Sequence, residues 1–259
     1  MIPLEDSLAK LRSERAEFRL ESRHAIPDLV LLNYINEVEE NAFAVIEFKN
    51  TQSIHRAWPN ARAAFESAQL ALLLTTDPQY DLAGARAWIY HLRKDRTFAE
   101  ADEESFNSES GGFSSDAWYQ GAVKEMEALW DELSPGKGRF IPQAELLLDQ
   151  QPRRPDNWAG VSIAPTLRDR MKTITVGSSP SSNLDTAEVY NRAYSGLTRH
   201  SHPQMRLRPM GVRGTPNGPV TFEFEERNVA QEYESISALT AGATLLAIAA
   251  LLVRSRHAI

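Results

Sequence analysis

The stretch Ser235–Val253, SISALTAGATLLAIAALLV, decides which kind of fold this chain adopts. It contains no charged residue, and Arg254 and Arg256 follow it. At about 1.5 Å per residue, a helix over this stretch is long enough to cross the apolar core of a bilayer. However, Ala, Thr, Ser and Gly make up much of the run, and they contribute little transfer free energy compared with Leu or Phe. We therefore favour a helix buried on all sides at the centre of a bundle, with a C-terminal membrane anchor as the alternative.

Helical patterns also dominate the rest of the chain. Apolar residues from Val30 to Phe48 recur at steps of three to five, closer to a helical period than to the alternation of a strand. Pro59 falls in the first turns of the next predicted helix, where proline is tolerated. An acidic, Ser- and Gly-rich segment over 100–115 predicts a loop, and only 220–224 alternates enough to be a short strand. Helices are predicted at about 4–22, 30–48, 55–75, 81–98, 116–133, 143–150, 165–174, 185–202 and from 229 onward.

These patterns predict an all-α fold in two parts. A charged helical segment occupies residues 1–41. A helical bundle domain with irregular, Pro-rich connections occupies residues 42–259 and ends in the long apolar helix. The interruptions between the predicted helices are marked by Pro and Gly, which break helical geometry.

The composition excludes several classes of site and of protein. The chain has no cysteine, which removes disulfides, thiolate nucleophiles and Cys-ligated metal centres. A net charge of −7 argues against a generally basic nucleic-acid-binding surface but not against a local basic site. Charges run throughout Met1–Glu40, so we expect no signal peptide. We predict a cytoplasmic protein without cofactor or metal, not attached to a membrane unless the apolar stretch is an anchor.

The densest collection of chemically versatile residues is YNRAYSGLTRHSHP, residues 190–203. Tyr190, Tyr194, Thr198 and His202 are each four apart, so they form one stripe along a helix face. The surrounding run 189–222 contains five Arg, two His and no Asp or Glu. Such a run is suited to contact phosphate or another anion. The alternatives are an internal polar seam for the stripe and a solvated loop for the basic run.

A second pair of interest lies on the predicted helix 55–75. Arg62 and Glu66 are four apart and share a face with Gln69. A pair at this spacing is usually a surface ion pair worth a few tenths of a kcal/mol. Small apolar neighbours favour partial burial here. If the two helices meet, Glu66 and His202 would form an acid–base pair.

Two motifs together resemble a bacterial family of helical domains of unknown function that is similar to the HEPN superfamily. The first is R-[SA]-x-x-E, present as Arg62-Ala-Ala-Phe-Glu66. The second is Y-x-x-[LI]-[ST]-x-x-x-H-P, present as Tyr194 to Pro203. Trp158 lies between them, and an Ala-rich closing helix follows, so the similarity covers roughly residues 42–253. It implies a HEPN-like bundle with a shared polar cluster of Arg62, Glu66, Tyr194, Thr198 and His202.

Many HEPN domains are ribonucleases or toxin components, so the resemblance implies that this chain engages RNA or nucleotide phosphate. It further implies metal-independent ribonuclease activity within a defence or toxin system. The catalytic residues would then be His202 as general acid or base, Glu66 as its orienting partner and Arg199 at the phosphate. Because HEPN-like bundles commonly pair, we expect a homodimer, and a partner protein from the same system. The expected substrate-binding residues are Arg62, Arg192, Tyr194, Thr198, His200 and Arg206.

The chain departs from the catalytic HEPN pattern, in which four to six residues separate an Arg from a following His. Seven residues separate Arg192 from His200, and two separate Arg199 from His202. Arg19–His24 and Arg86–His91 fit the spacing, but chance alone predicts about as many matches. The alternative function is therefore a non-catalytic interaction or regulatory module, whose polar cluster only fixes the register of its helices.

Overall fold

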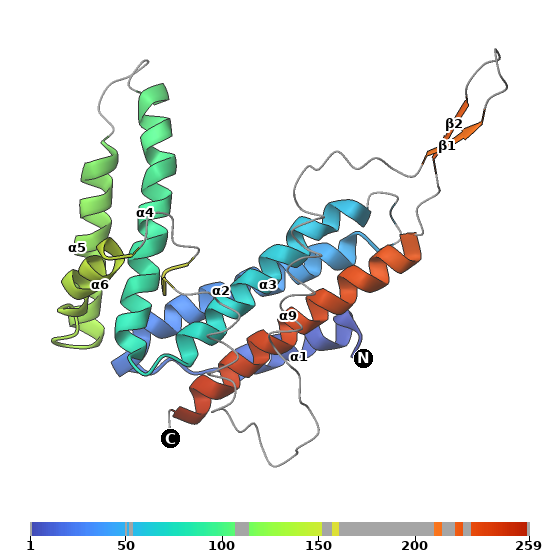
Figure 1. The fold of residues 1–259 in the computed structure, drawn as a ribbon. Coiled ribbons are helices and arrows are strands. Elements are labelled where there is room, and N and C mark those ends of the chain that lie inside the picture. Colours follow the sequence, from blue (N-terminus) through green and yellow to red (C-terminus); the bar gives the residue numbers. More distant parts are fainter. Residues whose placement is uncertain are drawn as a thin grey trace.

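The computed structural model describes residues 2–49, 51, 54–106, 114–151, 157–160, 210–213, 221–224 and 229–257. These residues are mainly helical, which confirms the prediction of an all-α chain, with one short hairpin in addition (Figure 1). The α-helices are α1 (Leu4–Glu17), α2 (Ala25–Glu47), α3 (Trp58–Thr75), α4 (Tyr80–Phe106), α5 (Ser115–Leu133), α6 (Phe140–Asp149) and α9 (Val229–His257). Two 3₁₀ turns, Ser22–His24 and Ile54–Ala57, precede α2 and α3.

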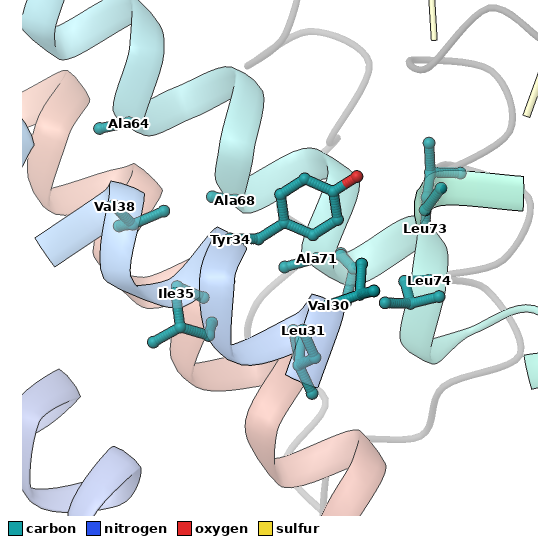
Figure 2. Packing of buried hydrophobic residues seen from close by; sticks show 14 of the residues in the cluster. Val30, Leu31, Tyr34, Ile35, Val38, Ala64, Ala68, Ala71, Leu73 and Leu74 are labelled. Carbon is teal, nitrogen blue, oxygen red and sulfur yellow. The ribbon is translucent and has the colours of Figure 1, made fainter. Parts of the chain in front are cut away.

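Helix α3 is the centre of the bundle, packed between α2 and α9, and α1 packs against α9 (Figure 1). Small residues at Ala64, Ala68 and Ala71 are fully buried and let the neighbouring helices come close. Figure 2 shows Val38 of α2 beside Ala64, and Val30 beside Ala71 and Leu74, so the two helices run antiparallel. The apolar core therefore lies on both sides of α3.

The apolar stretch of the sequence forms most of α9, but the prediction of a helix buried on all sides was wrong, because α9 packs one side on the other helices and leaves Leu245 39% exposed. Ala243, Ala247 and Leu251 are buried at successive turns. The buried Thr244 hydroxyl donates to Ser7 Oγ of α1 at 2.7 Å. Among the described helices, Val229–Arg256 is long and apolar enough to cross a membrane. An 18-residue stretch of it has a mean hydropathy of 2.2, and 56% of this stretch is buried within the protein. The helix thus combines a membrane-like composition with a place in the bundle core.

A second group of helices stands at a steep angle to the bundle (Figure 1). Here α4 packs against α5 and α6, around buried side chains that include Trp130. The prediction of a loop from residue 100 was wrong at its start, because α4 continues to Phe106. Ala and Glu, which are strong helix formers, dominate this segment. Arg96 also supports it by donating to Glu100 at 2.9 Å, and Glu103 accepts from the Ser115 backbone N–H at 3.1 Å, which ties it to α5.

Helices α2 and α4 approach each other closely at their beginnings. A Cβ on Gly84 would lie 2.6 Å from the Pro27 Cβ, so glycine is what permits this contact. Side-chain pairs between the two segments, His24–Asp81 and Tyr34–His91, have the same sequence separation of 57 residues as Pro27 and Gly84. The two helices therefore start side by side, and α4 leaves the bundle at a steep angle from there (Figure 1).

The hairpin consists of β1 (Met210–Arg213) and β2 (Thr221–Phe224), paired antiparallel with Met210 opposite Phe224. The stretch 220–224, predicted as a short strand or an extended arm, forms a strand at Thr221–Phe224, whereas its partner β1 was not predicted. The helices predicted at 165–174 and 185–202 lie outside the described residues. Residues 41 and 42, between which a domain boundary was predicted, both lie within α2. Helices α1 and α2 contribute to the same core cluster as α3 and α9.

Candidate functional site

Two of the predicted site residues, Arg62 and Glu66, lie in the part of the chain that the structure describes. Both are on α3, the central helix. The contact expected between this helix and the Tyr194–His202 stripe stays a prediction, because the other predicted site residues lie outside the described ranges. These residues are Arg192, Tyr194, Thr198, Arg199, His200, His202 and Arg206.

Arg62 and Glu66 form the ion pair that their spacing predicts. The Arg62 Nε–H donates to Glu66 Oε1 at 2.7 Å. The side chains are 24% and 40% exposed, because they lie on the outer side of α3 while Ala61 and Phe65 face the core. A pair in this setting contributes about 0.3–0.5 kcal/mol to stability. Its main effect is to fix the orientation of the planar guanidinium, whose donors are arranged to match a carboxylate or a phosphate.

The same row of α3 leads into a groove. Leu70, one turn beyond Glu66, lines a cavity of about 390 Å³ bounded by α2, α3 and α4. This volume falls within the roughly 300–1,000 Å³ of typical small-molecule sites. Val30, Leu70, Trp88 and Leu92 give the groove apolar walls, and the polar lining residues are Asn33, Tyr34, Glu37, Ser67, His91 and Asp95.

A hydrogen bond between Tyr34 and His91 crosses the groove from α2 to α4. The Tyr34 hydroxyl lies 2.7 Å from His91 Nε2. Burial raises the pKa of Tyr34 well above its usual value, although the nearby Trp158 side chain opposes this rise. Burial also lowers the pKa of His91, a shift that Lys94 reinforces and Asp95 opposes. At neutral pH the bond therefore joins a protonated phenol to a neutral imidazole, and the imidazole tautomer sets which of the two donates.

Trp158 is the tryptophan that lies between the two sequence motifs. Its side chain is fully buried next to Tyr34. The Arg86 guanidinium stacks over its ring at 5.6 Å, and Gln151 Nε2 donates to its carbonyl at 2.7 Å. Its indole Nε1 has no hydrogen bond of ordinary geometry in the structure. Trp158 thus lies next to Tyr34 but does not itself line the groove.

A separate polar cluster lies at the C-terminal end of α9. Asp28 and Arg254 are 0% and 4% exposed, and the guanidinium donates to both carboxylate oxygens, at 2.7 and 3.2 Å. The Tyr80 hydroxyl donates to Asp28 Oδ1 at 2.8 Å, and the Glu21 backbone N–H donates to Oδ2 at 3.1 Å. Burial by itself would lower the pKa of Arg254, but the hydrogen bonds and charge of Asp28 raise it instead. We call this set the Asp28–Arg254 cluster. The buried Asp28 carboxylate accepts four hydrogen bonds within it, so the role of the cluster is structural.

Neither cluster provides a metal centre. Within the described ranges, no group of three or more His, Asp or Glu side chains is arranged to hold a metal ion. Tyr34, Glu37, His91 and Asp95 were not predicted as site residues. The signal that could have found them is a shared spacing, because 30, 33, 34 and 37 on α2 repeat the i, i+3, i+4, i+7 pattern of 88, 91, 92 and 95 on α4.

No protein-family model, curated protein or solved structure matches this chain. Its function must therefore be argued from its own residues.

Proposed function

We propose that this protein is a HEPN-like helical module that engages RNA or nucleotide phosphate. The observation that supports this proposal most directly is the fixed orientation of the Arg62 side chain. Glu66 holds its guanidinium at 2.7 Å on the outer side of the central helix, where both side chains remain partly exposed. An oriented guanidinium matches the geometry of phosphate oxygens.

The basic run 189–222 supplies the remaining cations in this proposal. It contains five Arg and no acidic residue in a chain whose net charge is −7. Arg213, the last Arg of this run, lies in β1. The hairpin extends beyond the start of α9 (Figure 1). A run of this charge is suited to follow a phosphate backbone, with binding that weakens as salt rises.

Catalysis would use His202 as the general acid or base, with Arg199 at the phosphate and Glu66 as the orienting carboxylate. In this mechanism no metal takes part. Arg62, Arg192, Tyr194, Thr198, His200 and Arg206 would hold the substrate. The homodimer, the partner protein of a defence or toxin system and the cytoplasmic location belong to the same proposal.

The experiment compares binding of a mixed single-stranded RNA pool by the wild type and by Arg62→Ala and Arg199→Ala. Arg96→Ala is the matched control, because Arg96 forms an (i, i+4) pair with Glu100 at 2.9 Å and 34%/50% exposure on α4. For single strands, each lost phosphate contact makes the plot of log K against log salt shallower by about 0.7. We expect this change for Arg62→Ala and Arg199→Ala and none for Arg96→Ala.

Cleavage is measured on the same RNA pool in the presence of a chelator. We expect the wild type to cleave and His202→Ala to bind without cleaving. A wild type that binds no RNA at low salt would contradict the proposal, as would equal losses from Arg62→Ala and Arg96→Ala. RNA binding without cleavage would support the RNA-binding part of the proposal and contradict the ribonuclease part.

One observation favours the second candidate, a non-catalytic interaction or regulatory module. The two His side chains that the structure describes are both engaged in bonds between helices: His24 to Asp81 at 2.8 Å and His91 to Tyr34 at 2.7 Å. Such bonds fix helix register. If the wild type neither binds nor cleaves RNA while His202→Ala lowers the melting temperature, this second function is supported instead.

A further inference from the structure

The groove between α2, α3 and α4 has two chemically different ends. Glu37 and Asp95 are the last groove-lining residues of α2 and α4, two helices that start side by side. One end of the groove therefore carries two carboxylates. Val30 and Trp88 are the first lining residues of the same two helices and lie toward the other end, with the Tyr34–His91 bond between the two ends.

The charge of the groove is also one-sided. Among the residues that the structure describes, no Lys or Arg lines it. Glu37 accepts from the Asn41 side-chain amide at 3.4 Å, and neither Glu37 nor Asp95 has an ion-pair partner in the part of the chain that the structure describes. Lys94, on the same helix as Asp95, is held over the Tyr90 ring at 4.7 Å and does not line the groove.

We propose that this groove binds an organic cation, an alkylguanidinium or alkylammonium group, with its charge at Glu37 and Asp95 and its apolar body against Trp88. Trp88, Leu70, Leu92 and Val30 line the groove with apolar surface that buries the alkyl chain. The two carboxylates repel phosphate, so this site is distinct from the RNA site proposed above. The ligand is either a free small molecule or the side chain of a basic peptide.

The test uses n-butylguanidinium, its neutral isostere n-butylurea, and a capped peptide with a single Arg. Binding is measured by calorimetry and by the shift of the Trp88 indole N–H signal, which Trp88→Phe assigns. We expect n-butylguanidinium to bind and to move the Trp88 signal, and n-butylurea to bind at least about tenfold more weakly. Tighter binding of the peptide indicates a protein partner, and binding of n-butylguanidinium alone indicates a free small molecule.

The decisive variant is Glu37→Gln/Asp95→Asn, which removes both charges with little change in shape. We expect it to weaken n-butylguanidinium about tenfold or more while leaving RNA binding unchanged. The matched control is Glu40→Gln, an exposed carboxylate one turn along α2 that does not line the groove; it should bind as the wild type does. The proposal is overturned if no cation binds at millimolar concentration, if the double variant binds equally well, or if n-butylurea matches n-butylguanidinium.

Discussion

Arg254 and Arg62 each donate to a carboxylate at 2.7 Å, yet their surroundings are opposite. Arg254 and Asp28 are almost fully buried and joined by bonds from Tyr80 and Glu21. Arg62 and Glu66 are neighbours on one helix and partly exposed. Distance alone therefore does not tell what an ion pair contributes. Removing one partner of the buried pair costs much free energy of folding, because water cannot reach the partner that is left. In the exposed pair, water solvates the remaining partner, so the cost is small.

The largest expected effect follows from breaking the buried pair. Arg254→Ala leaves the Asp28 carboxylate buried without its main partner, so the free energy of unfolding should fall by about 3–5 kcal/mol in urea titration. Arg256→Ala, an exposed position on the same turn, is the control and should change little. Asp28→Asn/Arg254→Met, which removes both charges, should recover part of the loss. A wild-type-like Arg254→Ala would mean that the end of α9 does not depend on this cluster.

The Tyr34–His91 bond is intermediate in exposure, and its effect should appear as a pH dependence. The folded protein lowers the pKa of His91, chiefly through burial, below the ordinary value of 6.5. The unfolded chain therefore binds more protons between the two pKa values, and stability is fully present above about pH 6.5 and falls on acidification. We expect His91→Gln to lose less stability than the wild type between about pH 7.5 and pH 5. The difference between the two proteins cancels the other titrating groups, and equal losses would contradict this prediction.

The smallest effect concerns the exposed pair. Glu66→Gln should lower the free energy of unfolding by only about 0.3–0.5 kcal/mol. Glu100→Gln, which removes the matching pair with Arg96 on α4, should have a similar effect. A loss above about 2 kcal/mol for Glu66→Gln, several times the value for a surface pair, would show that Arg62 and Glu66 behave as a buried pair.

The sequence predicted what depends on local pattern. The helix over 58–75 with its early Pro59, the long apolar helix and the (i, i+4) partners Arg62 and Glu66 all follow from neighbours within one or two turns. Even the error in α4 was local, since an acidic segment was taken for a loop although its Ala and Glu residues favour a helix.

Pairings between distant residues could not be predicted in this way. Asp28 and Arg254 are 226 residues apart. Tyr34 and His91 are 57 apart, and nothing local shows that their helices start side by side. That arrangement depends on the close approach of Pro27 and Gly84. Such an approach arises only when the two helices pack together, so the sequence of either helix alone does not show it.

The central place of α3 has a consequence for how the chain folds during synthesis. Helix α3 ends at residue 75 and its partner α9 begins at residue 229, so about 150 residues separate them. At roughly 5–20 residues per second, the ribosome needs about 8–30 seconds to supply α9. During that interval the face of α3 that α9 will cover stays exposed to water and to other nascent chains. Contacts of such long sequence separation also form slowly, so the last apolar helix controls both when this bundle becomes stable and how long it is open to aggregation.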